Sequence, residues 1–238
     1  GNDFMFDPEC QFSMLLHELK IDNLIQVRLT RSARYTNDGE YDYFNYEFMR
    51  AHIDIEFEFA LVRDCETDIN QHANTLRHYA EQCNHVTEMG VRFGNSTVMF
   101  MAARPKKFVS YDVHREKKCD YLELIAKDNE INWELRIENP SPEDATESMI
   151  EETDLLFIDT NHFKQQLELE LRLHAPKVRR WIIMHDVETF GFRGAGDDHI
   201  SDGMNLAIEP FLENHKDEWI MKERFTNNNG LMVLERIK

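Results

Sequence analysis

The chain has 238 residues, of which 42% are hydrophobic and 30% are charged, as is typical of a globular protein with one substantial core. Only 9 glycines and 6 prolines are present, which excludes fibrous and low-complexity classes. Lys and Arg number 27 against 45 Asp and Glu, so the formal net charge is −18. Such a surface repels nucleic acids and anionic lipids, and we expect neither a nucleic acid nor a membrane as partner.

The cysteines match neither a zinc site nor a CxxC redox motif, and their scatter favours reduced thiols. They are Cys10, Cys65, Cys83 and Cys119. No apolar run approaches the roughly 20 residues that a membrane-spanning helix needs. The opening GNDFMFDPEC lacks the features of a secretion signal. These observations together predict a cytoplasmic protein.

Residues 1–66 are irregular and are expected to form an N-terminal cap or extension. Four apolar residues at helical spacing predict a short helix over 10–20: Phe12, Leu15, Leu16 and Leu19. The aromatic stretch 34–50 is open to three interpretations: a sugar-stacking surface, a contact in a homo-oligomer, or packing against the rest of the chain. Residues 52–59 (HIDIEFEF) alternate apolar with polar, which predicts a half-buried strand, although a helix running on to Val62 also fits.

Strands and helices alternate over residues 67–238. Expected strands cover 85–89, 106–112, 133–138, 153–159, 179–186, 219–225 and 231–237. Expected helices cover 70–83, 96–103, 115–129, 163–174 and 204–214. The last two strands flank Asn227-Asn228-Asn229-Gly230, which is typical of a hairpin turn. The pattern predicts an α/β fold: a mostly parallel seven-stranded sheet, covered on both faces and ending in an antiparallel hairpin.

Ligands of open parallel sheets bind beyond the carboxyl ends of the strands, and polar residues follow all of the first five strands here. In the first turn, Gly90 and Gly94 allow a tight bend and a close approach to a ligand. Ser96 is expected to cap the next helix, whose N-terminus would face an anionic group. Asp112 is placed to accept hydrogen bonds from a ribose diol. The alternative is a turn that needs glycine only for its geometry.

The segment EMGVRFGNST (88–97) resembles the first motif of class I S-adenosylmethionine-dependent methyltransferases. More narrowly, the chain is similar to their cephalosporin-hydroxylase-like and rhamnosyl O-methyltransferase-like branch. The supporting segments are TDINQH (67–72), SYD (110–112), FID (157–159) with His162, MHD (184–186), TFGFRG (189–194) and RFTNNNGLMVLER (224–236). The resemblance implies a Rossmann-like methyltransferase domain over 67–238. It also implies methyl transfer to oxygen on a small molecule or carbohydrate.

The resemblance also implies a set of cofactor-binding residues. They are Glu88, Gly90, Arg92, Gly94 and Ser96 at the methionine end, Asp112 at the ribose, Glu138 and Asn139 beside the adenine, and Asp159. Arg92 and Phe93 separate Val91 from Gly94, so the loop lacks the GxGxxG spacing of NAD-binding domains. That departure disfavours a pyrophosphate cradle.

Asp159 and Asp186 are expected at adjacent strand ends, where they could share one divalent cation such as Mg²⁺ or Mn²⁺. In the resembling enzymes an acidic residue after the fourth strand and an acidic pair after the fifth bind magnesium. Here His185 replaces the first member of that pair, and imidazole suits manganese, iron or zinc better. The site therefore has fewer protein ligands, takes another metal, or is vestigial. The proposed catalytic residues are Asp186 and a base, either His162 or His185.

The loop 190–203 contains a second polar cluster, Asp197-Asp198-His199 with Asp202. A solvated loop that closes over the substrate explains this cluster better than a second metal site does. Two other functions remain open: an oxidative, hydroxylase-type enzyme on the same fold, and a non-catalytic module that binds a partner.

Overall fold

A computed structural model describes residues 52–195 and 202–238. The chain divides after His52, and residues 53–238 form a compact unit of their own. The predicted helix over 10–20, the aromatic stretch 34–50 and the cluster Asp197-Asp198-His199 lie outside the described residues. Of the cysteines that are described, Cys65, Cys83 and Cys119 are free thiols.

One seven-stranded sheet with the order β3-β2-β1-β4-β5-β7-β6 organises this part of the chain. The strands are β1 (His85–Met89), β2 (Lys107–Asp112), β3 (Trp133–Ile137), β4 (Thr153–Ile158), β5 (Val178–His185), β6 (Trp219–Phe225) and β7 (Leu231–Arg236). The first five are parallel, whereas β7 runs antiparallel to both β5 and β6. The predicted mostly parallel sheet with a C-terminal hairpin is confirmed.

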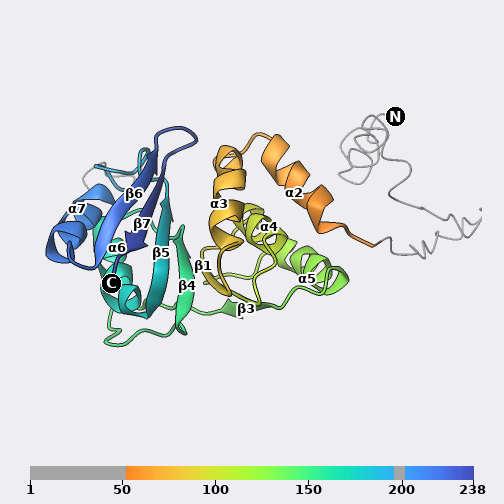
Figure 1. Cartoon of the computed structure of the whole chain (residues 1–238), viewed down its shortest axis with the longest axis horizontal. Helices are drawn as coiled ribbons and strands as arrows, with labels where there is room; N and C mark the ends of the chain where they lie inside the picture. Colours follow the sequence, from red (N-terminus) through yellow and green to blue (C-terminus); the bar gives the residue numbers. More distant parts are fainter. Residues whose placement is uncertain (1–51, 196–201) are drawn as a thin grey trace, which may run out of the picture. The chain divides into compact units, whose positions relative to one another are not determined.

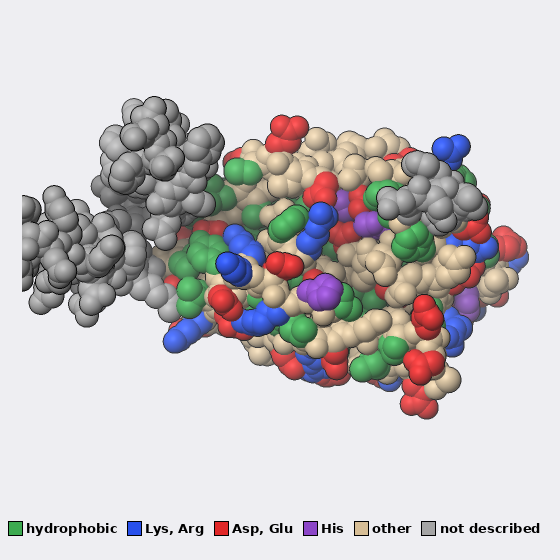
Figure 2. Space-filling view, turned by 180° about the vertical axis from the view of Figure 1, so that it is seen from behind, with side chains coloured by type: hydrophobic (Ala, Val, Ile, Leu, Met, Phe, Trp, Pro, Cys, Tyr) green, Lys and Arg blue, Asp and Glu red, His purple; other side chains and the backbone are tan. Residues whose placement is uncertain are grey.

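Helices cover both faces of this sheet (Figure 1). They are α2 (Ile55–Asp64), α3 (Ala73–Ala80), α4 (Asn95–Ala102), α5 (Lys118–Asp128), α6 (Lys164–His174) and α7 (Asn205–Asn214). One apolar core lies between the sheet and α2–α5, and a second between the sheet and α6–α7. None of the described helices has the length and apolar character needed to cross a bilayer. Acidic and basic side chains are interspersed over the face shown in Figure 2, so the negative charge is not gathered there.

The predicted strand over 52–59 is wrong, because these residues begin helix α2. The Asp54 side chain accepts a hydrogen bond from the backbone N–H of Glu56 at 2.9 Å and caps the helix. Ile55 and Phe59, four residues apart, then share a buried face that packs against α4. The alternation of apolar and polar residues fits both a strand and a helix. The Asp54 cap and the shared buried face of Ile55 and Phe59 favour the helix.

His174, at the end of α6, ties the segment between β3 and β4 to the core. The ring is fully buried, with Nε2 2.8 Å from Ser141 Oγ and Nδ1 2.8 Å from Ser148 Oγ. Burial lowers the pKa of His174 to about 4, so the folded protein holds a neutral imidazole.

We expect His174 to make the protein less stable in acid. The unfolded chain binds a proton near pH 6.5, whereas the folded chain does not until about pH 4, so unfolding becomes easier as the pH falls between these values. The contribution is about 2–3 kcal/mol at pH 4.5. Urea denaturation at pH 7.5 and pH 4.5 should show a smaller pH-dependent loss in His174→Gln than in the wild type. Equal losses in the two proteins would contradict this role.

Candidate functional site

The turn after β1 brings the backbone close to the end of β4. Gly90 has φ +96°, and a Cβ there would clash with the carbonyl oxygen of Asp159. Its N–H donates to the carbonyl of Tyr111 at 2.9 Å, while the N–H of Asp159 donates to the carbonyl of Met89 at 2.9 Å. The ends of β1, β2 and β4 therefore lie side by side, and the close approach of the Asp159 carbonyl to Gly90 leaves no room for a side chain there.

Glu88 lies beneath this turn and is completely buried. Its carboxyl group accepts hydrogen bonds from the hydroxyls of Ser96, Thr97 and Ser110 at 2.7, 2.9 and 2.6 Å. Burial raises the pKa of Glu88 to about 7, against the opposing effect of these hydroxyls. Ser96 donates its hydroxyl to Glu88 and does not cap α4, whose N-cap is Gly94, so the prediction of a Ser96 cap is wrong.

Asp112, at the end of β2, shapes the same turn. One carboxylate oxygen accepts the backbone N–H groups of Val91 and Arg92 at 2.9 Å each, and the other accepts that of His114 at 3.0 Å. A carboxylate offers about four lone-pair sites, so these bonds leave capacity for a ligand.

A cleft of about 190 Å³ opens at this edge of the sheet. It is lined by five residues that the sequence singled out: Gly90, Arg92, Asp112, Asn139 and Asp159. Four others that the sequence singled out, Glu88, Gly94, Ser96 and Glu138, are not among its lining residues. Tyr111, Thr160 and Asn161 also line the cleft and follow from the strand ends, although no role was predicted for them, whereas Gln166 and Glu170 were missed. Gln166 and Glu170 lie four residues apart on α6. Two polar residues at this helical spacing, shortly after a strand end, were the signal that could have identified them as cleft residues.

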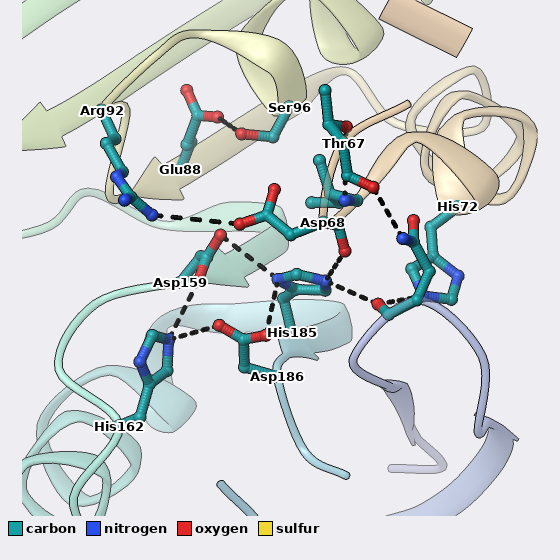
Figure 3. Close-up of polar contacts among 12 residues, drawn as sticks. Thr67, Asp68, His72, Glu88, Arg92, Ser96, Asp159, His162, His185 and Asp186 are labelled. Carbon is teal, nitrogen blue, oxygen red and sulfur yellow. Dashed lines mark hydrogen bonds and ion pairs between the residues drawn. The ribbon is translucent and has the colours of Figure 1, made fainter. Parts of the chain in front are cut away.

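Beside the cleft, two aspartates and two histidines face one another; we call Asp159, His162, His185 and Asp186 the carboxylate–histidine cluster (Figure 3). His162 Nε2 lies 3.3 Å from Asp159 Oδ1 and 2.9 Å from Asp186 Oδ2. His185 Nδ1 lies 3.5 Å from Asp159 Oδ2 and 3.6 Å from Asp186 Oδ1. Each carboxylate thus turns one oxygen toward each histidine.

The cluster's charges shift its pKa values strongly. Burial opposes ionisation of Asp159, but its contacts with the two imidazoles hold the pKa of Asp159 well below its usual range. Burial likewise opposes a charge on His162, yet Asp159 and Asp186 raise the pKa of His162 to about 9. The pKa of His185 is also raised, against burial, chiefly by Asp159.

This donor set suits a divalent cation. One ligand atom each from Asp159, His162 and Asp186 lies within 4.8 Å of the others. His185 Nδ1 and Asp186 Oδ1 are buried without a hydrogen-bond partner among the described residues. Asp186 also has φ +63°, a left-handed conformation that Asp and Asn tolerate better than most other side chains. The residues present therefore fit a metal ion.

In the loop after β5, the described residue Asp202 is separate from the carboxylate–histidine cluster. It forms a β-bridge with Arg193 and an ion pair with Lys164, whose Nζ is 3.6 Å from Asp202 Oδ2. These contacts account for Asp202 without a second metal site.

No protein-family model and no curated protein matches this chain. Solved structures do share its architecture. The O-methyltransferase TomG from Streptomyces achromogenes, in complex with S-adenosylmethionine, has 12% sequence identity and a TM-score of 0.53, over 80% of this chain and 92% of TomG. This is the Rossmann-like methyltransferase fold.

Two further methyltransferase structures have the same architecture. The S-adenosylhomocysteine-bound PaMTH1 of Podospora anserina matches over 100% of both chains with 13% identity and a TM-score of 0.51. A methyltransferase from Geobacter sulfurreducens has 13% identity and a TM-score of 0.51, over 79% of this chain and 93% of its own. Within the methyltransferase fold, the cleft of this chain occupies the carboxyl ends of β1, β2 and β4, where open parallel sheets bind ligands.

Proposed function

We propose that the protein is an S-adenosylmethionine-dependent methyltransferase. It transfers the methyl group to a hydroxyl oxygen of a small molecule or carbohydrate, with the help of a divalent cation. The observation that carries this proposal is the position of Asp159, which lines the cleft and also belongs to the carboxylate–histidine cluster. A methyl donor in the cleft would therefore lie beside an acceptor hydroxyl held at the cluster.

The cleft has groups that suit each part of the cofactor. Gly90 exposes backbone at the centre of the turn, and Asp112 keeps lone pairs available for ribose hydroxyls. The Arg92 side chain is 72% exposed, with its guanidinium 3.9 Å from Asp68 Oδ2 and over the Phe93 ring, and it would turn from these weak contacts to the methionine carboxylate. Asn139 would lie beside the adenine. Glu88 and Ser96 would support the turn from below.

The cluster has groups that suit the acceptor. Asp159 and Asp186, with His185 as a third ligand, would hold the cation, which when bound polarises the acceptor hydroxyl and offsets the charge of the carboxylates. His162 is the better candidate for the base, because its side chain is 18% exposed whereas that of His185 is 1% exposed. With its Nε2–H directed at both carboxylates, His162 would accept the hydroxyl proton at Nδ1, once a bound cation offsets the carboxylate charges that raise its pKa to about 9.

Calorimetric titration with S-adenosylhomocysteine, with and without Mg²⁺ or Mn²⁺, tests the proposed cofactor. We expect micromolar binding, followed by methyl transfer to one member of a panel of sugars and small alcohols. Absence of binding under every condition would contradict the proposal and favour a non-catalytic module. Iron-dependent oxygen consumption would instead indicate a hydroxylase-type enzyme.

Replacing Asp112 with alanine should weaken S-adenosylhomocysteine binding by about 10–10²-fold, because two hydrogen bonds to a charged group are lost. Loss of its bonds to the glycine turn adds to the effect. Titration calorimetry measures the change. Glu116→Ala, at an exposed acid a few residues further on, is the matched control and should bind within twofold of the wild type. Equal affinities of Asp112→Ala and the wild type would remove Asp112 from the cofactor site.

A further inference from the structure

The His185 ring is held in one tautomer by backbone carbonyls. Its side chain is 1% exposed, and Nε2 lies 3.1 Å from the carbonyl oxygens of both Asp68 and Asn228. A carbonyl oxygen only accepts hydrogen bonds, so the proton of the neutral ring belongs on Nε2. Nδ1 is then left with a lone pair.

The Nδ1 lone pair of His185 faces carboxylate oxygens, which also carry lone pairs. The nearest groups to Nδ1 are Asp159 Oδ2 at 3.5 Å and Asp186 Oδ1 at 3.6 Å, both beyond good hydrogen-bond distance. Nδ1 and Asp186 Oδ1 have no hydrogen-bond partner in the described part of the chain, although both are buried. Buried polar atoms are normally paired. A cation about 2.1 Å from each atom would separate such ligands by roughly 3–3.5 Å and would explain the arrangement.

The other oxygen of each carboxylate already has His162 as its partner. His162 Nε2 is within hydrogen-bond distance of Asp186 Oδ2 at 2.9 Å, with Asp159 Oδ1 at 3.3 Å. An N–H group on His162 Nε2 can donate directly to these carboxylates. The unpaired atoms therefore lie on the His185 side of the cluster.

We propose that His185 Nδ1 is the nitrogen ligand of this site and makes it select first-row transition ions such as Mn²⁺ over Mg²⁺. The inference rests on the cation of the proposed function and is independent of the methyl donor. Magnesium prefers oxygen ligands and dehydrates reluctantly, whereas imidazole is a common ligand of transition ions. A carboxylate in place of His185 would remove this preference.

Asn228 is the positioning residue for His185. Its side chain donates to the carbonyl of Thr67 at 2.7 Å and accepts from the backbone N–H of Gln71 at 2.9 Å. These bonds hold the turn after β6 against the segment that carries Asp68, so the two carbonyls converge on Nε2. His72 adds a third contact, with Nε2 3.2 Å from the Asn228 carbonyl oxygen.

Pulsed electron paramagnetic resonance of the Mn²⁺-loaded protein, with calorimetry for Mn²⁺ and Mg²⁺, tests the ligand. We expect a ¹⁴N coupling and at least about tenfold tighter binding of Mn²⁺ in the wild type. His185→Glu should lose the coupling and reduce the preference about tenfold, whereas His162→Gln should keep the coupling. The inference is overturned if Mn²⁺ does not bind, if it binds without nitrogen coupling, or if only His162→Gln removes the coupling.

A second pair of variants tests the positioning. Asn228→Gly tolerates the left-handed backbone (φ +47°) but loses both side-chain bonds, and it should weaken Mn²⁺ binding by about tenfold. Asn229→Gly is the matched control, since Asn229 also has positive φ (+67°) but makes no side-chain hydrogen bond within the described residues. Equal Mn²⁺ affinities of the two variants would contradict the role of Asn228. A wild-type protein that binds Mn²⁺ with nitrogen coupling but does not bind S-adenosylhomocysteine would refute the methyltransferase and leave the metal site standing.

Discussion

Replacing Asp186 with asparagine is expected to lower methyl transfer by about 10²–10³-fold while S-adenosylhomocysteine still binds. Asp186 does not line the cleft, so the cofactor keeps its contacts. The substitution removes a negative charge from the cluster and changes the hydrogen bond with His162. Asparagine is the residue that best tolerates the φ of +63° after glycine, so the turn after β5 should persist.

Steady-state kinetics and S-adenosylhomocysteine calorimetry on the same preparation separate the two effects. Asp217→Asn, which removes an exposed acid before β6, controls for net charge and should keep wild-type turnover. Undiminished turnover in Asp186→Asn would end the cation-assisted mechanism. Loss of cofactor binding together with turnover would instead show that Asp186 supports the cleft.

Replacing Gly90 with alanine is expected to cost about 3 kcal/mol in the free energy of unfolding and to abolish S-adenosylhomocysteine binding. The φ of +96° is strained for any side chain, and the Cβ would clash with the backbone oxygen of Asp159. A backbone atom cannot rotate away as the end of a side chain can. The turn would therefore move and pull Asp159 from its place between the cleft and the cluster.

Urea denaturation measures this cost, and Gly94→Ala provides the comparison. Gly94 also has positive φ (+75°), but its Cβ would meet the flexible side chain of Leu122, at 2.7 Å. We expect Gly94→Ala to lose roughly 1–2 kcal/mol. A cost for Gly90→Ala no larger than that for Gly94→Ala would mean that the close approach to Asp159 is unimportant.

Most of the sheet could be predicted because of where its strands lie. Every residue of β1 and β4 is buried, since helices cover both faces. The apolar run LLFI marks β4, whereas β1 (HVTEM) has three polar residues and is marked by the glycine turn that follows it. Helix α2 could not be predicted in the same way. The spacing of Ile55 and Phe59 fits both a strand and a helix, and their burial against α4 decided between the two.

The candidate site was predictable to the extent that it depends on strand ends. The carboxyl ends of parallel strands meet at one edge, so Asp112, Asp159 and Asp186 could be expected near one another. Their orientations could not be predicted. Glu88 turns inward to three hydroxyls, and His185 is fixed by carbonyls 117 and 43 residues away in the sequence. Such contacts depend on the register of distant segments, which local patterns do not encode.

Asp159 belongs to both the cleft and the cluster, and this makes the two sites parts of one thermodynamic system. A ligand that reorients or neutralises this carboxylate in one site changes the affinity of the other site for its own ligand. By reciprocity, the factor by which a cation changes the affinity for the cofactor equals the factor by which the cofactor changes the affinity for the cation. In the proposed methyltransferase, cofactor affinity would therefore depend on the cation concentration, and supply of either ligand would regulate occupancy by both.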